Sequence, residues 1–352
     1  MIATPAVFQS FETREEWLAA RRVDARVSAS DVSRILGLAP PSWGAGFSVW
    51  LDHQPDDVRG VTPGDEEQED EGSILTEGQE WEPAVLSVWA SRRGATVRNL
   101  TNTLAVCTVP GLEWAVASLD ASVATHPDPA WAGRILECKT SRKGPNEFGP
   151  DGSEIREWVD DAGDILPVYY ATQGYWQMLV TGAPCVVFVV AIARSWGMPE
   201  LRTITLHRNA DMIEAIAEDV REWREKYLLG DEVPPLDTTS EARAYLTRTT
   251  PPPDTVVLSA TEAQEVLLEK LAEAATWKEY ADEIRAQLAV GIGPHKGIRG
   301  AAGTFMRSRS NGKTSISMKR LEALAPELVR TLTERGVVAT SGPSDSFKFT
   351  RA

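Results

Sequence analysis

Hydrophobic side chains recur every three or four residues in several parts of the chain, which is the spacing of one face of an α-helix. In segment 78–93, Trp81, Val85 and Trp89 repeat every four residues, and Glu82 falls on nearly the same side. We therefore expect a helix there that directs one carboxylate towards the core. Helices are predicted in the same way at about residues 14–22, 28–36, 167–180 and 211–228.

Between these segments, apolar and polar residues alternate with the period of two that is typical of strands. The alternation predicts strands at about residues 96–107, 114–122 and 134–141, which we expect to form a three-stranded meander. The nine-residue apolar run 185–193 predicts a buried strand that pairs with residues 201–207, and it is too short to span a membrane. Because helices and strands alternate, an α/β fold is expected.

Two polar stretches divide the chain. Residues 52–77 are rich in Asp, Glu, Gly and Pro and contain few apolar residues, so they predict a surface loop. Residues 233–258 are rich in Pro, Thr and acids, and we interpret them as a linker. The linker would separate a main domain of residues 1–232 from an accessory region of residues 259–352.

The accessory region has two recognisable parts. Ser259 and Glu262 have the spacing of a capping box in front of a long helix, which we expect to extend to about Val290. Residues 295–320 hold seven Lys or Arg residues and no acid, and they predict a basic hairpin that turns at residues 310–312. This hairpin could contact duplex DNA or be a solvated surface feature.

The composition is that of a folded, acidic protein. Of its 352 residues, 42% are hydrophobic and 25% are charged, close to the average for globular proteins. The 36 Lys and Arg against 51 Asp and Glu give a net charge of −15, which argues against non-specific coating of nucleic acid but allows a localised basic groove. With three cysteines and no secretion-signal pattern, we expect a cytoplasmic protein that does not enter a membrane.

The strongest indication of chemistry comes from two of the predicted strands. Glu137 and Lys139 are two residues apart and project from one face, and Asp120 can reach the same point if the strands pair. Two carboxylates and an ammonium suit Mg²⁺ or Mn²⁺ bound to a phosphodiester, with Lys139 beside the attacking water. An ordinary cross-strand salt pair is the alternative. The apolar neighbours Ile135 and Leu136 favour a buried site, where charges without a partner are costly.

Asp120, Glu137 and Lys139 resemble the D…(D/E)xK motif of the PD-(D/E)XK nucleases. The order of motifs resembles the lambda exonuclease branch, which includes the YqaJ and RecE-type phage recombination nucleases. Leu119 stands where that family usually has a proline. The further matching motifs span about residues 14–193 and are Trp17-x-x-x-Arg21, Val27-Ser28-Ala29-Ser30-Asp31-Val32, Gly78-Gln79-Glu80-Trp81-Glu82 and Tyr170-Ala171-Thr172-Gln173.

The resemblance implies a fold of the α/β (α+β) class. Its PD-(D/E)XK restriction-endonuclease-like core would have a mixed central sheet flanked by helices, followed by a C-terminal helix and β-hairpin region. Two Mg²⁺ ions, with Mn²⁺ as a possible substitute, would be held by Glu82, Asp120, Glu137 and the carbonyl of Cys138. The other catalytic residues implied are Lys139, which would activate water, and Gln173.

Arg21, Ser30 and Gln173 are implied to receive the 5′-phosphate of a DNA end. General chemistry agrees, because Arg suits bidentate phosphate contacts and Ser30 lies at a helix start, where free amides favour anions. Each also has a purely structural interpretation: a solvated charge for Arg21, a helix cap for Ser30 and a buried amide for Gln173.

The function implied by this resemblance is a Mg²⁺-dependent 5′-to-3′ double-strand DNA exonuclease that leaves 3′ overhangs. Its implied partners are double-stranded DNA ends, a RecT-like single-strand annealing protein and further copies of itself in a homo-oligomer. Two alternatives remain open at this point: an endonuclease on the same fold, and a catalytically silent DNA-binding protein. Bases can stack on aromatic side chains, but we expect most of these six tryptophans to belong to the core: Trp43, Trp50, Trp114, Trp131, Trp158 and Trp176.

Overall fold

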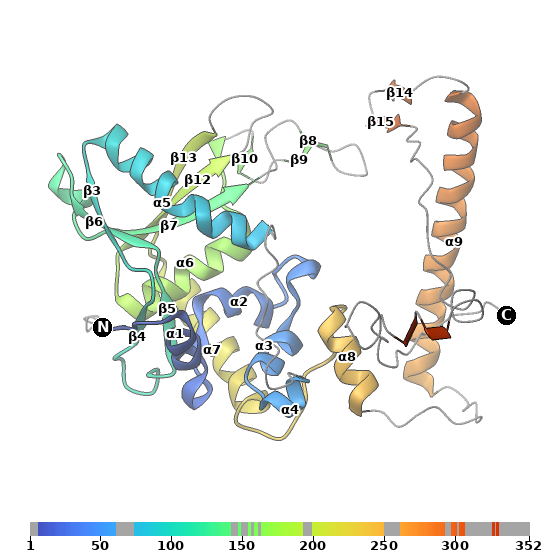
Figure 1. Cartoon of the computed structure of the whole chain (residues 1–352), viewed down its shortest axis with the longest axis horizontal. Coiled ribbons are helices and arrows are strands. Elements are labelled where there is room, and N and C mark those ends of the chain that lie inside the picture. The colour runs from blue at the N-terminus through green and yellow to red at the C-terminus, as the bar shows by residue number, and fades with distance from the viewer. Residues whose placement is uncertain are drawn as a thin grey trace. The chain divides into compact units, whose positions relative to one another are not determined.

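The computed structural model describes residues 6–60, 74–141, 147–148, 154–155, 158–160, 163–192, 199–249, 261–292, 297–300, 303–306, 326–327 and 329–330. The chain divides into two units, one of Met1–Gly149 with Glu154–Tyr245 and one of Pro150–Ser153 with Leu246–Ala352. The first unit contains the two larger sheets and the helices around them (Figure 1). Within the described ranges, no helix is long and apolar enough to cross a membrane.

The first sheet has four strands in the order β1-β4-β5-β2, and the second has five in the order β13-β12-β7-β6-β3. Each sheet is mixed, because β2 pairs with β5 in parallel and β7 pairs with β12 in parallel, whereas the other pairings are antiparallel. A mixed α/β architecture was predicted, and it is confirmed. The strands are β1 (Val7–Ser10), β2 (Val27–Ser28), β3 (Thr96–Asn99), β4 (Thr103–Val106), β5 (Ala115–Ser118), β6 (Ala121–Thr125), β7 (Ile135–Ser141), β12 (Cys185–Ile192) and β13 (Glu200–His207).

The prediction of a three-stranded meander is wrong. The first predicted strand is split into β3 and β4 near Asn102, which has a positive φ of 54°, and the second is split into β5 and β6 next to Asp120. At both breaks the chain passes from one sheet to the other, and the backbone N–H of Leu100 donates to the carbonyl of Asp120 at 3.0 Å. Asp120 therefore lies at a junction between the sheets and not within a strand.

The five helices that the sequence predicted within residues 1–232 begin and end close to the predicted positions. Their ends follow from local signals: Thr13 caps α1 with a capping box, and Gly182, at φ 70°, ends α6. The predicted helices are α1 (Arg14–Arg22), α2 (Ala29–Ile35), α5 (Ile74–Arg93), α6 (Val168–Thr181) and α7 (Ala210–Tyr227). The structure adds α3 (Gly46–Asp52), α4 (Asp56–Arg59) and α8 (Ser240–Thr249), of which α8 crosses the boundary between the units, and the 3₁₀ turns η1 (Val23–Ala25), η2 (Pro41–Trp43) and η3 (Pro129–Trp131).

Two predicted irregular stretches contain helices. Within the predicted loop 52–77, α4 covers residues 56–59 and α5 begins at Ile74, while residues 61–73 lie outside the described residues. Within the predicted linker 233–258, α8 covers residues 240–249. Short helices of this kind carry too few apolar residues to produce a clear helical period in the sequence.

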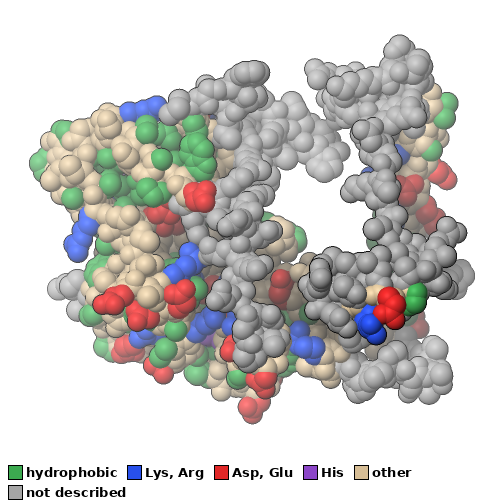
Figure 2. Space-filling model, in the orientation of Figure 1, with side chains coloured by type: hydrophobic (Ala, Val, Ile, Leu, Met, Phe, Trp, Pro, Cys, Tyr) green, Lys and Arg blue, Asp and Glu red, His purple; other side chains and the backbone are tan. Residues whose placement is uncertain are grey.

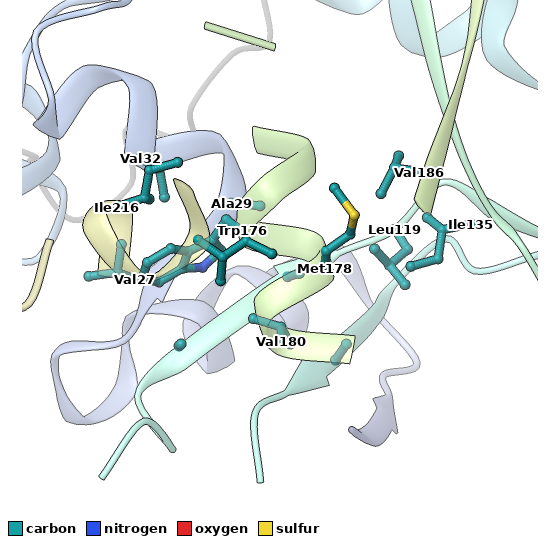
Figure 3. Close-up of a cluster of buried hydrophobic side chains, with 14 of the residues drawn as sticks. Val27, Ala29, Val32, Leu119, Ile135, Trp176, Met178, Val180, Val186 and Ile216 are labelled. Atoms are coloured by element: carbon teal, nitrogen blue, oxygen red, sulfur yellow. The ribbon is translucent and has the colours of Figure 1, made fainter. Parts of the chain in front are cut away.

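Strand β12 is buried on both faces and separates two parts of the core. Its residues Val186, Phe188 and Val190 pack with α6, whereas Val187 and Val189 pack with α5. Figure 3 shows α6 residues Trp176, Met178 and Val180 next to residues from β2, α2, α7 and β7. The continuous apolar run that predicted this strand thus reflects helices on both sides of the sheet.

The second unit consists mainly of α9 (Glu262–Ile292) and the hairpin of β14 (Gly297–Gly300) and β15 (Gly303–Met306). The long helix is confirmed, but its capping pair is Thr261 with Gln264, whose backbone and side-chain groups bond reciprocally. The hairpin turns between residues 300 and 303, and the predicted turn at residues 310–312 lies outside the described residues. Four further two-residue strands pair as β8 (Glu147–Phe148) with β9 (Glu154–Ile155) and as β10 (Val159–Asp160) with β11 (Gly163–Asp164).

Candidate active site

Glu137 and Lys139 lie on β7, where the alternation of the strand determines their direction. Leu136 and Cys138 pack with α5 on one face of the sheet, and Ile135 packs with α6 on the other. Glu137 shares the face of Ile135, is only 2% exposed, and is bonded to residues of α6. As predicted, the pair projects from one face, at the buried side that α6 covers.

Three polar contacts hold the Glu137 carboxylate. Lys139 Nζ lies 2.5 Å from Oε1, Gln173 Nε2 donates to the same oxygen at 2.6 Å, and Gln177 Nε2 donates to Oε2 at 2.6 Å. Gln177 Nε2 also lies 3.5 Å from the carbonyl of Ser118. A carboxylate held on both oxygens has a fixed orientation, which is a requirement for a group that positions a reaction.

Gln177 is a site residue that the sequence analysis did not identify. It is fully buried in α6, four residues after Gln173, so both amides are on the side of the helix that faces β7. The i, i+4 spacing of two glutamines on an otherwise apolar helix face was the signal that could have found it.

Asp120 reaches the site from the junction between β5 and β6. Its Oδ2 accepts a 2.6 Å hydrogen bond from the backbone N–H of Cys138. Burial, reinforced by the nearby carboxylates of Glu137 and Glu82, raises the pKa of Asp120 well above its usual value, although Lys139 and the Cys138 amide oppose the shift. The predicted convergence of Asp120 with Glu137 and Lys139 is present in the structure.

Glu82 contributes a third carboxylate from α5. It is half-buried, and burial followed by repulsion from Glu137 raises the pKa of its carboxyl group. Val85 and Trp89 on the same helix are buried, as predicted, but Trp81 is 52% exposed, so its predicted inward direction is wrong. The apolar stripe of α5 therefore starts only after Glu82, near the end of the sheet that carries the site.

Lys139 is the cation of this cluster. Burial alone would lower its pKa, but the carboxylates of Glu137 and Asp120 outweigh that effect and raise the pKa of the ammonium above its usual value. Its Nζ also lies 5.0 Å from the centre of the Tyr170 ring, within the range of a cation–π contact. Lys139 thus stays protonated and is held between carboxylates and an aromatic face.

The charges of the cluster favour a bound cation. Three carboxylates meet one ammonium, and burial together with repulsion from Glu137 raises the pKa of Asp120 and of Glu82 although Lys139 opposes both shifts. Oxygen donors of this kind suit a hard divalent ion. In the residues that the structure describes, however, no three His, Cys, Asp or Glu side chains are arranged to ligate one ion together. Metal binding would require some of the hydrogen bonds to Glu137 to open.

Cys138, whose carbonyl was predicted as a ligand, has a buried thiol whose pKa is raised by burial and by the nearby Asp120. The thiol packs with α5, on the opposite face of β7 from Glu137. Only backbone atoms of Cys138 therefore take part in the site, and its N–H already bonds Asp120.

The residues predicted to bind a 5′-phosphate form a separate contact. Arg21 Nη2 donates to Ser30 Oγ at 2.7 Å, and the guanidinium lies 4.8 Å from the centre of the Trp17 ring. Burial lowers the pKa of Arg21, while the neighbouring Asp31 opposes the shift. Gln173, the third predicted member, bonds Glu137 instead. The helices that carry Ser30 and Gln173, α2 and α6, pack against each other.

Charged side chains outside these clusters are mixed in sign. Figure 2 shows acidic and basic side chains interspersed over the coloured part of the first unit on the face turned to the viewer. Many pair locally, as Arg221 does with Glu218 at 2.9 Å. On the described part of this face, the basic groove that we considered from the sequence is not visible as one continuous surface.

Residues 16–184 match the family model of the YqaJ-like viral recombinase domain. The uncharacterized protein YqaJ of Bacillus subtilis (strain 168) is 28% identical over 240 residues, which cover 66% of this chain and 62% of that protein. The alignment thus spans less than two thirds of the relative's length.

Two solved structures are also similar. An alkaline exonuclease from Laribacter hongkongensis matches with 18% identity and a TM-score of 0.40, over 61% of this chain and 93% of that one. A phage related exonuclease from Haemophilus somnus 129PT matches with 16% identity and a TM-score of 0.37, over 57% and 93%. The resemblance to YqaJ-type proteins that the motifs indicated is confirmed by the match of residues 16–184 to the model of the YqaJ-like viral recombinase domain.

Proposed function

We propose that this protein is a Mg²⁺-dependent double-strand DNA exonuclease that degrades 5′ to 3′ and leaves 3′ single-stranded overhangs. The observation that carries the proposal is the convergence of Asp120, Glu137 and Lys139 in a buried cluster, within the segment that matches the YqaJ-like domain. Mn²⁺ is a possible substitute for Mg²⁺.

We also infer that β7, α6 and β12 are the centre of a PD-(D/E)XK core. These elements form a parallel strand–helix–strand unit, with α5 on the other face of the same strands. Such a unit supports residues from adjacent strands and their crossover helix at one end of the sheet. Glu137 and Lys139 on β7, and Gln173 and Gln177 on α6, have this relationship.

Under this proposal, Glu82, Asp120, Glu137 and the Cys138 carbonyl hold two divalent ions, which when bound polarise the phosphodiester and lower the pKa of a coordinated water. Lys139 orients the attacking water and favours its deprotonated form. Gln173 and Gln177 fix the orientation of Glu137, as their 2.6 Å hydrogen bonds indicate. Asp120 is held in place by the Cys138 amide.

Arg21 and Ser30 would receive the 5′-phosphate of the DNA end and so determine the polarity of degradation. A guanidinium held by a hydroxyl and an aromatic ring presents further N–H donors to a phosphate. Assembly into a homo-oligomer and delivery of the 3′ strand to a RecT-like annealing protein belong to the same proposal, and rest on the family resemblance.

The test is digestion of linear duplex DNA with a different label on each strand end, with and without Mg²⁺. We expect the 5′ label to be released first and only in the presence of Mg²⁺. A closed circular duplex, the control, should stay intact. Glu137→Gln should reduce the rate on the order of a hundredfold or more. Glu218→Gln, on the surface of α7, is the matched control and should leave the rate unchanged. Cleavage of the circle would contradict the exonuclease proposal and favour an endonuclease.

A further inference from the structure

Trp43 is a large aromatic residue that remains exposed beside the candidate active site. It lies in η2, and 42% of its surface is accessible, whereas most of the six tryptophans named in the sequence were expected in the core. Its ring contacts Tyr169 edge-on, with centroids 5.2 Å apart, and Tyr170 at a tilt, with centroids 5.8 Å apart. Neither contact is a parallel stack, so much of the indole remains open to a ligand.

The backbone on both sides of Trp43 has a constrained conformation. Trp43 follows Pro40 and Pro41, and its N–H donates to the carbonyl of Pro40 at 2.9 Å. Gly44 has a φ of 80°, and a Cβ at this position would lie 2.3 Å from Ser48 Oγ, so only glycine fits without strain. An aromatic side chain on such a turn loses little conformational entropy when it binds a ligand.

Two aromatic contacts connect Trp43 to the catalytic cluster. Tyr170, which touches Trp43, also lies 5.0 Å from Lys139 Nζ and stacks on buried Trp158 with a centroid distance of 5.3 Å. The exposed indole of Trp43 and the ammonium of Lys139 therefore contact the same tyrosine ring. A nucleotide whose phosphodiester reaches Lys139 would have its base within reach of Trp43.

We propose that Trp43 is a stacking surface for the base of a nucleotide at the DNA end, a subsite that positions the terminal nucleotide for cleavage. This inference rests on the proposed function. A nucleobase is the suitable ligand because it presents a flat π face, and stacking on an aromatic side chain tolerates any base sequence. Removing such a contact typically weakens binding by about 5- to 100-fold.

The experiment compares binding of two hairpin duplexes in EDTA by fluorescence anisotropy. One duplex has an ordinary nucleotide at its open 5′ end, and the other has an abasic tetrahydrofuran residue at that position. We expect wild-type protein to prefer the ordinary end by about tenfold, Trp43→Ala to bind both ends equally, and Trp43→Phe to keep most of the preference. Phe8→Ala, which removes an aromatic residue 51% exposed on β1 of the other sheet, should keep all of it.

An equal loss of affinity for both ends in Trp43→Ala would assign the residue a structural role and overturn the inference, as would a wild-type protein that does not distinguish the two ends. The circular dichroism melting curve of Trp43→Ala identifies any loss of folding. If that variant does not fold, the binding preference of Trp43→Phe decides whether the inference holds. Binding is measured without metal, so it does not depend on the proposed hydrolysis. Failure of the proposed function would be seen separately, as undiminished digestion of DNA by Glu137→Gln.

Discussion

Gln177 and Glu137 form a fully buried hydrogen bond in which Gln177 Nε2 donates to Glu137 Oε2 at 2.6 Å. The other amide atom, Oε1 of Gln177, has no hydrogen-bond partner among the residues that the structure describes. A buried polar atom without a partner lowers the free energy of unfolding by about 1–3 kcal/mol, so this glutamine makes the folded protein less stable than a fully bonded side chain would. Orientation of the Glu137 carboxylate is the compensating role that the geometry indicates.

Replacement of Gln177 by methionine, of similar size but apolar, should therefore lower kcat about tenfold and leave KM nearly unchanged. The carboxylate would rotate more freely, while the surface that binds DNA would be intact. Steady-state kinetics on linear duplex DNA measure both constants. Gln54→Met, which removes a 3.2 Å bond to the carbonyl of Trp50 in α3, is the control. A rise in KM at constant kcat would contradict the positioning role.

Asp120→Asn should stabilise the protein in the absence of divalent ions. Asparagine is isosteric and still accepts the Cys138 N–H, but it removes one of three carboxylates that face a single ammonium. Removal of a charge that is buried and repelled by its neighbours should raise the free energy of unfolding by about 1 kcal/mol. Urea titration in EDTA measures the change, with Asp211→Asn at the start of α7 as the control.

Addition of Mg²⁺ should raise the melting temperature of the wild-type protein and have little effect on Asp120→Asn. A ligand that binds only the folded state stabilises it, by about 2.7 kcal/mol when its concentration is a hundred times the dissociation constant. Thermal melting with increasing MgCl₂ follows the shift, and NaCl at equal ionic strength separates specific binding from screening. Equal shifts in both proteins would argue against Asp120 as a ligand.

Arg21→Ala should remove the distinction between 5′-phosphorylated and 5′-hydroxyl ends. Arg21 bonds Ser30 at 2.7 Å, and the charged donors that remain suit a terminal phosphate. We expect the ratio of kcat/KM for the two substrates to fall from about tenfold to near one, because a hydrogen bond to a charged group contributes about 1.5–3 kcal/mol. Arg98→Ala, on exposed β3, should keep the ratio of the wild type.

Asp237 should contribute its full stabilisation only above about pH 4. Its carboxylate accepts hydrogen bonds from Ala45, Ser48 and Thr239, and these outweigh the effect of burial and lower its pKa to about 2. Because the folded pKa lies below the ordinary value of 3.8, the contribution is complete above that value and is lost as the pH falls towards 2.

Asp237→Ala should accordingly lower the free energy of unfolding at pH 7 by about 1 kcal/mol, a modest value because the carboxylate is partly exposed. Urea titrations at several pH values between 7 and 2 should show this difference shrinking as the pH falls below 4. Asp231→Ala, on the exposed chain after α7, should show no such pH dependence. A difference that stays constant down to pH 2 would exclude the carboxylate charge as its source.

Local signals in the sequence determined what could be predicted. The ends of α1, α2 and α6 follow from caps and glycines, and the two-residue spacing of Glu137 and Lys139 is sufficient to place them on one face of a strand. These features depend on contacts between residues close together in the chain, and the periods of 3.6 and 2 report them directly.

Features that depend on distant contacts were not predictable. The alternation of residues 96–107 and 114–122 is the same whether each forms one strand or two strands in different sheets, because the period of two carries no information about the partner. The role of Gln177 depends on the packing of α6 against β7, and the exposure of Trp81 depends on where the sheet ends beneath α5.

The crossing at Asp120 has a consequence for how this chain can change in evolution. Because Leu100 N–H bonds the carbonyl of Asp120, the two crossings of the chain between the sheets are fastened to each other. The connections at residues 107–114 and 126–134 can then gain or lose residues at their tips without displacing the side chain of Asp120. Lineages that remodel these tips would inherit the same cluster of acidic side chains.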